Sequence, residues 1–471
     1  MSSVLNRQRA SGSGAQGGAG YVIENSLRFN DDDSAYLSFT KGAPTDGSKG
    51  VMGVWLKRSN ISLSAISTIV YGSPGESTRI EITNGTDVIN IADDGVQCLE
   101  TNQVFRDPTA FFHLLLSYDS DEGTAANRLK MFLNGVEITS FAADGRSNIA
   151  SGEEWGLLVN GGVQQWGFGA GAGTYWDGYM AQAFIIDGTS IQNGDYAVSD
   201  FIDTDSNGNV IPVDLEGAGI TWGNNGSLLD FAIAPGVGNG AGTDVSGNDN
   251  HFSESGLAAN DRVSDSPTDD VELLVGNYAT LSPIGPFITT GTHGVAAITN
   301  GNLYFDNNAS SYLYASSAFI IPKSGKWAFQ VTFRGPVING SQNDQGAGLY
   351  TRKTTGMSNA ATEGNIIVGW QGDVFKNGSA VDNGTALAVD DVVEFLIDVD
   401  ADTIKYLVNS SLRYTSTSVG LGNGEDWFPG GYGYQNELEF DFGQTGYEPS
   451  DSAYLTLNTG NLFAPAVKDP S

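Results

Sequence analysis

Short alternating segments between glycine-rich turns constrain the fold of this chain more than any other feature. The segment GKWAFQVTFRG (325–335) places its large apolar residues on one face: Trp327, Phe329, Val331 and Phe333. A period of two is that of a β-strand with one buried face. No segment of similar length keeps the 3.6-residue apolar period of an amphipathic helix. The chain is therefore predicted to be all-β.

Turn chemistry supports the same class. RLKMFLNGVEITSF (128–141) sets Asn134-Gly135 between two alternating segments, which is the strongest short signal for a β-hairpin. Glycine makes up 63 of 471 residues, about twice its usual share, so turns are frequent and strands are short. Two-sheet sandwiches of jelly-roll type would bury one face of each such strand.

Changes in composition divide the chain into four segments. Residues 1–20 form a Gly/Ser-rich stretch without acids, which we expect to be a flexible arm. Strand signals dominate residues 21–190 and return from residue 277, which predicts a sandwich in 21–190 and another in 277–471 with a short C-terminal tail. Residues 191–276 show little alternation and are expected to be an irregular but ordered, turn-rich linker.

The charge balance excludes several classes of partner. Lys and Arg total 22 and Asp and Glu total 55, which gives a net charge of −33. This excess argues against binding to nucleic acid and to anionic membranes, both of which require basic surfaces. We find neither an N-terminal signal peptide nor an apolar run long enough to span a bilayer. Cys98 is the single cysteine, so no intrachain disulfide is expected.

An ordered series of motifs in the first half resembles a known domain type. The motifs are LRFNDDDSAYLSFT (27–40), MGVWLKRS (52–59), QVFRDPTAFFHLLLSYD (103–119), NRLKMFLNGVEITSF (127–141) and YWDGYMAQAFIIDG (175–188). They resemble a laminin-G/pentraxin-type domain, which is a concanavalin A-like jelly roll. This version of the domain is common in virion proteins of tailed bacteriophages, so the resemblance implies that the chain is such a protein.

The second half resembles a SPRY domain. The segments that carry this likeness are NGNLYF (300–305), SGKWAFQVTF (324–333), DVVEFLIDVDADTIKYLVNSS (391–411) and LEFDFGQTGYEP (438–449). In SPRY domains, loops at one end of the sandwich bind partners. The resemblance therefore implies a binding module and does not imply an enzyme.

The segment DTDSNGNVIPVD (203–214) is spaced like an EF-hand calcium loop. The candidate ligands are Asp203, Asp205, Asn207 and Asp214, with Gly208 at the turn position. Asp214 is shorter than the usual closing Glu, and no amphipathic helix flanks the loop. A calcium site and a polar turn that leads into the linker both remain open, and no other cofactor is expected.

Two glycine-rich segments carry clusters of aromatic residues that could bind a partner. The candidates in the first segment, GFGAGAGTYWDG and the tryptophan before it, are Trp166, Tyr175 and Trp176. Those in the second segment, GEDWFPGGYGY, are Trp427, Phe428, Tyr432 and Tyr434. Aromatic side chains on loops can stack on sugar rings or become buried in an interface. The alternative is that the same side chains pack in the core.

Signals for catalysis are weak throughout. Glu394, Asp398 and Asp400 share one side of a predicted strand, but their spacing is not the pattern of jelly-roll glycosidases. We find no nucleophile elbow, phosphate-binding loop or dinucleotide motif. The protein is predicted not to be an enzyme.

Together these observations predict a structural protein of a phage virion. The first hypothesis is a tail-fibre or spike-type appendage, with the trimer as the favoured oligomer. Its arm, through Arg7 and Arg9, would dock on other virion proteins of the tail, neck or capsid, and its sandwiches would bind a host-surface glycan or protein. The alternatives are a capsid or collar decoration protein and a secreted carbohydrate-active enzyme.

Overall fold

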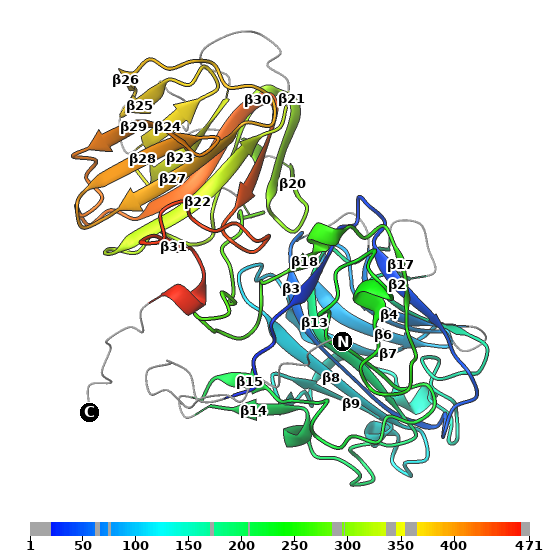
Figure 1. Cartoon of the computed structure of the whole chain (residues 1–471). Coiled ribbons are helices and arrows are strands. Elements are labelled where there is room, and N and C mark those ends of the chain that lie inside the picture. The colour runs from blue at the N-terminus through cyan, green and yellow to red at the C-terminus, as the bar shows by residue number, and fades with distance from the viewer. Residues whose placement is uncertain are drawn as a thin grey trace, which may run out of the picture.

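The computed structural model contains two all-β lobes (Figure 1). It describes residues 20–61, 66–73, 77–169, 174–205, 208–284, 294–295, 297–335, 345–353 and 365–462. The proposed docking residues Arg7 and Arg9 lie outside this part of the chain. The prediction of an all-β fold made of sandwich domains is confirmed.

The first lobe is built from two sheets of eight strands each. One sheet has the order β10-β9-β8-β3-β13-β1-β18, with β16 paired to β13. Its strands are β1 (Ser26–Phe29), β3 (Lys49–Arg58), β8 (Phe112–Asp119), β9 (Leu129–Leu133), β10 (Val136–Glu137), β13 (Gly178–Asp187), β16 (Ser227–Leu229) and β18 (Arg262–Val263).

The facing sheet of the first lobe has the order β11-β7-β6-β5-β4-β12-β2-β17. Its strands are β2 (Tyr36–Thr40), β4 (Ser67–Gly72), β5 (Thr78–Ile82), β6 (Val88–Asp93), β7 (Val96–Val104), β11 (Phe141–Asp144), β12 (Val163–Trp166) and β17 (Ser253–Ser255). The two sheets enclose one large apolar cluster, to which Leu27, Leu56, Ile80, Leu116 and Trp166 belong.

The sequence-predicted hairpin is present as β9–β10. Asn134 and Gly135 have φ values of 49° and 78°, and Val136 pairs with Leu133 across the turn. Positive φ at both central residues is the geometry that Asn-Gly favours.

The segment expected to be an irregular linker covers the first lobe and adds strands to it. Its strands β16, β17 and β18 pair with β13, β2 and β1. Phe201, Leu215 and Trp222 from this segment pack on the outer face of the first sheet. Because this sheet is covered on both sides, β13 is buried along its whole length. A separate hairpin is formed by β14 (Ile202–Thr204) and β15 (Val210–Pro212).

The second lobe contains one sheet of thirteen described strands, with the path β26-β25-β24-β23-β30-β22-β27-β28-β29. Strands β19, β20 and β31 attach to its side, as does β21, which pairs with β30. The bounds are β19 (Gly294–Val295), β20 (Ala297–Thr299), β21 (Tyr304–Ser316), β22 (Lys326–Phe333), β23 (Gln345–Thr351), β24 (Asn365–Gly369), β25 (Val374–Lys376), β26 (Ser379–Asp382), β27 (Val392–Asp398), β28 (Thr403–Val408), β29 (Ser411–Thr417), β30 (Trp427–Asp441) and β31 (Leu455–Thr456).

The core of the second lobe confirms the alternation seen in the sequence. Trp327, Phe329, Val331 and Phe333 are all fully buried in one apolar cluster, whereas Lys326 on the same strand is exposed. Phe329 stacks on Phe395 with ring centroids 4.7 Å apart.

Helical structure in the described residues is limited to short 3₁₀ turns: η1 (Ala125–Asn127), η2 (Arg146–Asn148), η3 (Val198–Asp200), η4 (Gly240–Gly242), η5 (Ala259–Asp261) and η6 (Thr459–Asn461). Within this part of the chain, none of the helices has the length and apolarity that crossing a membrane requires.

Candidate functional site

Three half-buried aromatic side chains gather at one end of the first sandwich. Tyr36 opens β2, and Phe168 and Tyr175 lie on the segment that joins β12 to β13. Phe168 stacks on Tyr175 with centroids 4.7 Å apart, and Tyr36 lies 5.1 Å from Phe168 and 6.4 Å from Tyr175. We call Tyr36, Phe168 and Tyr175 the aromatic trio. Its partial exposure leaves aromatic surface available to a ligand.

Backbone pairing fixes the position of the aromatic trio. A bridge joins Phe168 to Tyr175, and the Trp176 amide donates to the Gly167 carbonyl oxygen at 2.8 Å. Trp166 and Trp176, on either side of this bridge, are fully buried in the core. The two tryptophans thus anchor the segment, and Phe168 and Tyr175 between them stay partly exposed.

An acidic pair lies close to the trio along the chain. Asp31 is in the turn between β1 and β2, and Asp177 directly precedes β13. Burial, together with the charges of Asp31 and Asp32, raises the pKa of Asp177 well above its ordinary value. Burial and the charge of Asp32 also raise the pKa of Asp31. For both carboxyls, burial is the largest cause of the raised pKa.

Most of the sequence-predicted aromatic candidates are core residues. Trp166, Trp176, Trp427, Phe428 and Tyr432 are each at most 4% exposed, so a partner cannot reach them without unfolding the sandwich. GEDWFPGGYGY is mainly part of the long strand β30 and is not a free loop.

Tyr175 and Tyr434 are the two candidates that keep partial exposure. They lie in different sandwiches, so the structure does not bring the two predicted clusters together. Tyr36, which completes the trio, was not predicted from the sequence. Tyr36 lies in a strand-like segment, where the sequence does not distinguish an exposed aromatic residue from one in the core.

The calcium-like loop forms the β14–β15 hairpin. Asp205 lies at the turn and accepts from the Asn209 amide at 2.8 Å, whereas Asp214 lies beyond the open end and accepts from the Gly217 amide at 3.1 Å. The register pairs Asp203 with Ile211, so the hairpin holds Asp205 and Asp214 apart. Asn207 lies outside the described residues. Calcium binding at this loop stays a prediction.

The acidic side chains considered for glycoside chemistry have structural partners. Glu394 accepts from the Tyr447 hydroxyl and the Ser450 amide, both at 2.8 Å. Asp398 pairs with Lys326 at 2.9 Å. Glu394 does line a shallow depression of about 350 Å³ with Gln330, Asn409 and Ser410 among other residues, but its hydrogen bonds tie it to the segment that follows β30.

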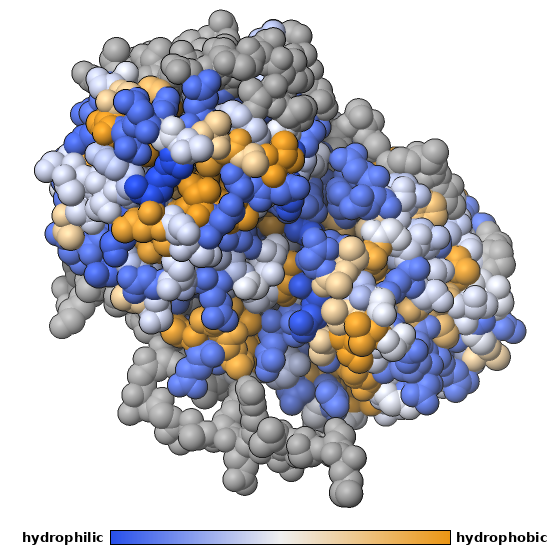
Figure 2. Space-filling model, turned by 45° about the horizontal axis from the view of Figure 1, so that its top comes forward, coloured by the Kyte–Doolittle hydropathy of each residue, from blue (hydrophilic) through white to orange (hydrophobic). Residues whose placement is uncertain are grey.

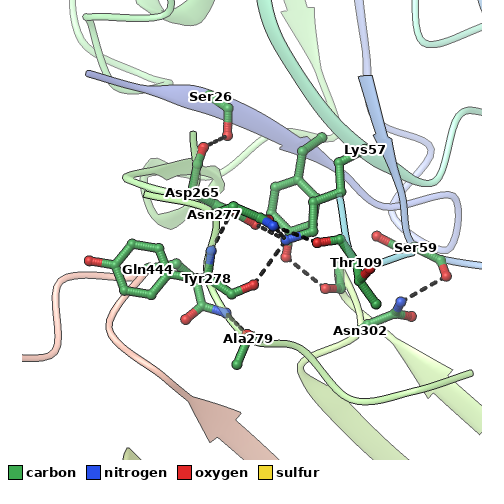
Figure 3. Close-up of polar contacts among 12 residues, drawn as sticks. Ser26, Lys57, Ser59, Thr109, Asp265, Asn277, Tyr278, Ala279, Asn302 and Gln444 are labelled. Carbon is green, nitrogen blue, oxygen red and sulfur yellow. Dashed lines mark hydrogen bonds and ion pairs between the residues drawn. The ribbon is translucent and has the colours of Figure 1, made fainter. Parts of the chain in front are cut away.

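The junction between the two lobes is built around a buried ion pair (Figure 3). Lys57 of β3 and Asp265 are both fully buried, and the lysine Nζ lies 2.9 Å from the Asp265 Oδ2. The same ammonium donates to the Asn277 Oδ1 at 2.7 Å and to the Tyr278 carbonyl oxygen at 3.0 Å. All three N–H donors of Lys57 therefore have acceptors.

Two further hydrogen bonds join the first lobe directly to the second. The Tyr179 hydroxyl donates to the Gly301 carbonyl oxygen at 2.6 Å, and the Asn302 Nδ2 donates to the Ser59 carbonyl oxygen at 2.7 Å. The one hint of this junction in the sequence is Lys57-Arg58, which directly follows the apolar run VMGVWL (51–56). Charges in such a strand require buried partners.

Comparisons with known proteins give likeness at the level of fold. No protein-family model and no curated protein matches the chain. Among solved structures, the SPRY domain of human HERC1 is 13% identical, with a TM-score of 0.27, over 31% of this chain and 91% of that chain. The heptameric SAP-like pentraxin from Limulus polyphemus is 12% identical, with a TM-score of 0.27, over 36% and 77% of the two chains.

A third similar structure is the TRIM65 PSpry domain. It is 11% identical, with a TM-score of 0.26, and the match covers 35% of this chain and 89% of that chain. The chain is thus structurally similar to SPRY domains and to pentraxin domains of the concanavalin A-like fold.

Proposed function

We propose that this chain is a virion protein of a tailed bacteriophage, a tail-fibre or spike-type appendage whose first sandwich recognises a host-surface glycan. The observation that carries the proposal is the aromatic trio of Tyr36, Phe168 and Tyr175 at one end of that sandwich. Aromatic faces pack against the apolar C–H faces of sugar rings. The polar turn between β1 and β2, which leads to Tyr36, offers hydrogen-bonding groups.

Charge and surface character agree with a glycan partner. The net charge of −33 disfavours nucleic acid and anionic lipid, but it does not disfavour neutral sugars. On the face drawn in Figure 2, hydrophobic residues form small patches separated by hydrophilic ones. Weak sugar binding at one site would gain avidity from several copies per appendage, which fits the proposed trimer.

Glycan-array binding tests the recognition part of the proposal. We expect the protein to bind a subset of bacterial surface glycans and Tyr175→Ala to lose most of this binding, because the substitution removes one ring of the trio. Tyr434→Ala is the matched control, since Tyr434 is also half-buried but lies in the other sandwich. Equal binding by the protein and Tyr175→Ala would overturn the assignment to the trio.

Electron microscopy of the phage particle with an antibody to this protein tests the location. Label at the tail or neck supports an appendage. Label spread evenly over the head would instead assign the chain to the decoration proteins and would overturn the proposal of glycan recognition.

A further inference from the structure

Lys57 and Asn277 place an amine against an amide carbon at the lobe junction. The Lys57 side chain is fully buried, and its Nζ lies 2.7 Å from the Asn277 Oδ1. Because a carbonyl bond is about 1.23 Å long, the Asn277 Cγ lies at most about 4 Å from the amine nitrogen. Reacting atoms are poised for attack at about 3 to 3.5 Å, so the amine is held near that range.

Hydrogen bonds fix the orientation of the Asn277 amide. Its Oδ1 faces Lys57, and its Nδ2 donates to the Thr109 carbonyl oxygen at 2.5 Å. The main chain is held as well, because the Asn277 amide donates to the Thr459 hydroxyl at 2.8 Å and the Asn277 carbonyl oxygen accepts from the Thr459 amide at 3.0 Å. The side chain thus turns its carbonyl group toward the amine and holds its Nδ2, the group that would leave, on a separate acceptor.

Asp265 supplies a proton acceptor at the same amine. Its Oδ2 lies 2.9 Å from the Lys57 Nζ, and its Oδ1 accepts from the Tyr278 amide at 3.0 Å, which fixes the carboxylate. Burial is the largest influence on both charged groups, and it lowers the pKa of Lys57 and raises the pKa of Asp265. Both directions favour transfer of a proton from the ammonium to the carboxylate, which leaves a neutral, nucleophilic amine.

The surroundings exclude water from the amine but leave an exit for a small product. The ring centroids of Phe111 and Tyr179 lie 5.7 and 5.5 Å from the Lys57 Nζ (Figure 3). Water therefore does not compete with the amine for the amide carbon. Asn277 itself is only half-buried, so a molecule the size of ammonia can leave from its side chain.

We propose that Lys57 and Asn277 form an intramolecular isopeptide bond, with Asp265 as the catalytic residue that moves protons. The Nζ lone pair attacks Cγ to form the new C–N bond, and the electrons of the carbonyl double bond move to Oδ1. When the carbonyl re-forms, the Cγ–Nδ2 bond breaks and its electron pair leaves with Nδ2. Of the three ammonium protons, one stays on the new amide, one leaves on Nδ2 as part of ammonia, and one remains on Asp265.

The reaction requires no oxidant and no second reactant, because one amide is exchanged for another. The bond links positions 220 residues apart and joins β3 of the first lobe covalently to the start of the second. The ion pair between Lys57 and Asp265 is the state from which the reaction starts. Stability changes that arise from this ion pair alone are those measured against Asn277→Ala, in which the bond cannot form. The inference is independent of glycan recognition.

Mass spectrometry of the full chain after denaturation tests the proposal. We expect an intact mass below that of the sequence by one ammonia molecule, and a tryptic digest with one linked peptide that contains both Lys57 and Asn277. The linked peptide is essential, because an asparagine that cyclises to a succinimide also releases ammonia but joins no two peptides. A chain of full sequence mass, with Lys57 and Asn277 in separate peptides, would overturn the proposal.

Four variants assign the residues. Asn277→Ala and Asp265→Asn should each keep their full sequence mass, because the first lacks the amide and the second lacks the proton acceptor. Asn277→Asp should form the same bond with loss of water in place of ammonia, which a purely structural role of this position would not produce. Lys49→Met, on the same strand as Lys57, is the control and should still lose ammonia.

The two Asn277 variants keep the Lys57–Asp265 pair and change a half-buried position, so they test the bond even if Asp265→Asn fails to fold. A linked peptide in Asn277→Ala would show that Lys57 reacts with another residue and would overturn the pairing. A linked peptide that forms equally in Asp265→Asn would overturn the catalytic role of Asp265.

Discussion

Replacing Lys57 with Met should weaken the junction between the lobes more than any other single charge removal at this interface. Methionine keeps the length and apolar stem of the side chain but removes the ammonium. Asp265 is then left fully buried with one remaining donor, the Tyr278 amide at 3.0 Å. The Asn277 and Tyr278 oxygens also lose a donor.

The magnitude follows from what is left unpaired. Removing one partner of a buried ion pair costs about 3 to 5 kcal/mol, because the other charge remains desolvated. The half-exposed Asn277 can turn to water, so the carboxylate dominates the cost. For a lobe of this size the loss lowers the melting temperature by on the order of 10 °C.

Scanning calorimetry measures this effect, and Lys49→Met on the same strand is the control. Lys49 pairs with Asp46 and Asp121, whose side chains are 41% and 49% exposed, so solvent screening limits its loss to about 0 to 1 kcal/mol. The double variant Lys57→Met with Asp265→Leu removes both charges and should recover most of the stability. If Lys57→Met and Lys49→Met melt at the same temperature, the buried pair does not hold the junction.

Two further predictions concern the segment around Asp177. Burial raises the pKa of Asp177, so the folded state binds a proton there more tightly than the unfolded state does. The stabilisation present at low pH should therefore be lost as the pH rises through the folded-state pKa. Melting curves against pH should show this loss relative to Asp177→Asn, with Asp31, Asp32 and Arg58 as the other charges that act on the site, and parallel curves would contradict it. Gly178→Ala should destabilise by about 2 to 5 kcal/mol, since φ is +148° and the new methyl group would collide with the Lys57 carbonyl oxygen. Gly194→Ala, where φ is +86° in open space, should cost only about 1 kcal/mol in the same melting assay, and equal costs would refute the role of the collision.

The sequence was sufficient to predict the fold class because the governing signals are local. The alternation around Phe329 and the Asn134-Gly135 turn each depend on neighbouring residues, and both reappear in the structure. The linker was harder to interpret. Its strands β16, β17 and β18 are two or three residues long, too short to show a period, and their pairing partners lie far away in the chain.

The candidate site was less predictable for a related reason. Aromatic residues on a glycine-rich segment look alike in sequence whether they are buried or exposed. Trp176 is fully buried and its neighbour Tyr175 is half-exposed, and only the bridge to Phe168 decides which side chain faces outward. The partners Asp31 and Asp177 are likewise distant in sequence, and no spacing rule connects them.

The buried junction has a consequence for any ligand that the sandwiches bind. Lys57, Tyr179 and Asn302 each donate hydrogen bonds from one lobe to the other, and these bonds would be lost if the lobes separated. Relative motion of the lobes would therefore break several hydrogen bonds at once, two of them donated by the buried Lys57 ammonium. A ligand site on the first sandwich and a second site on the SPRY-like sandwich would accordingly be presented in one fixed orientation. Simultaneous binding to two surface groups would then depend on their spacing, because this junction, unlike a flexible linker, cannot adapt to it.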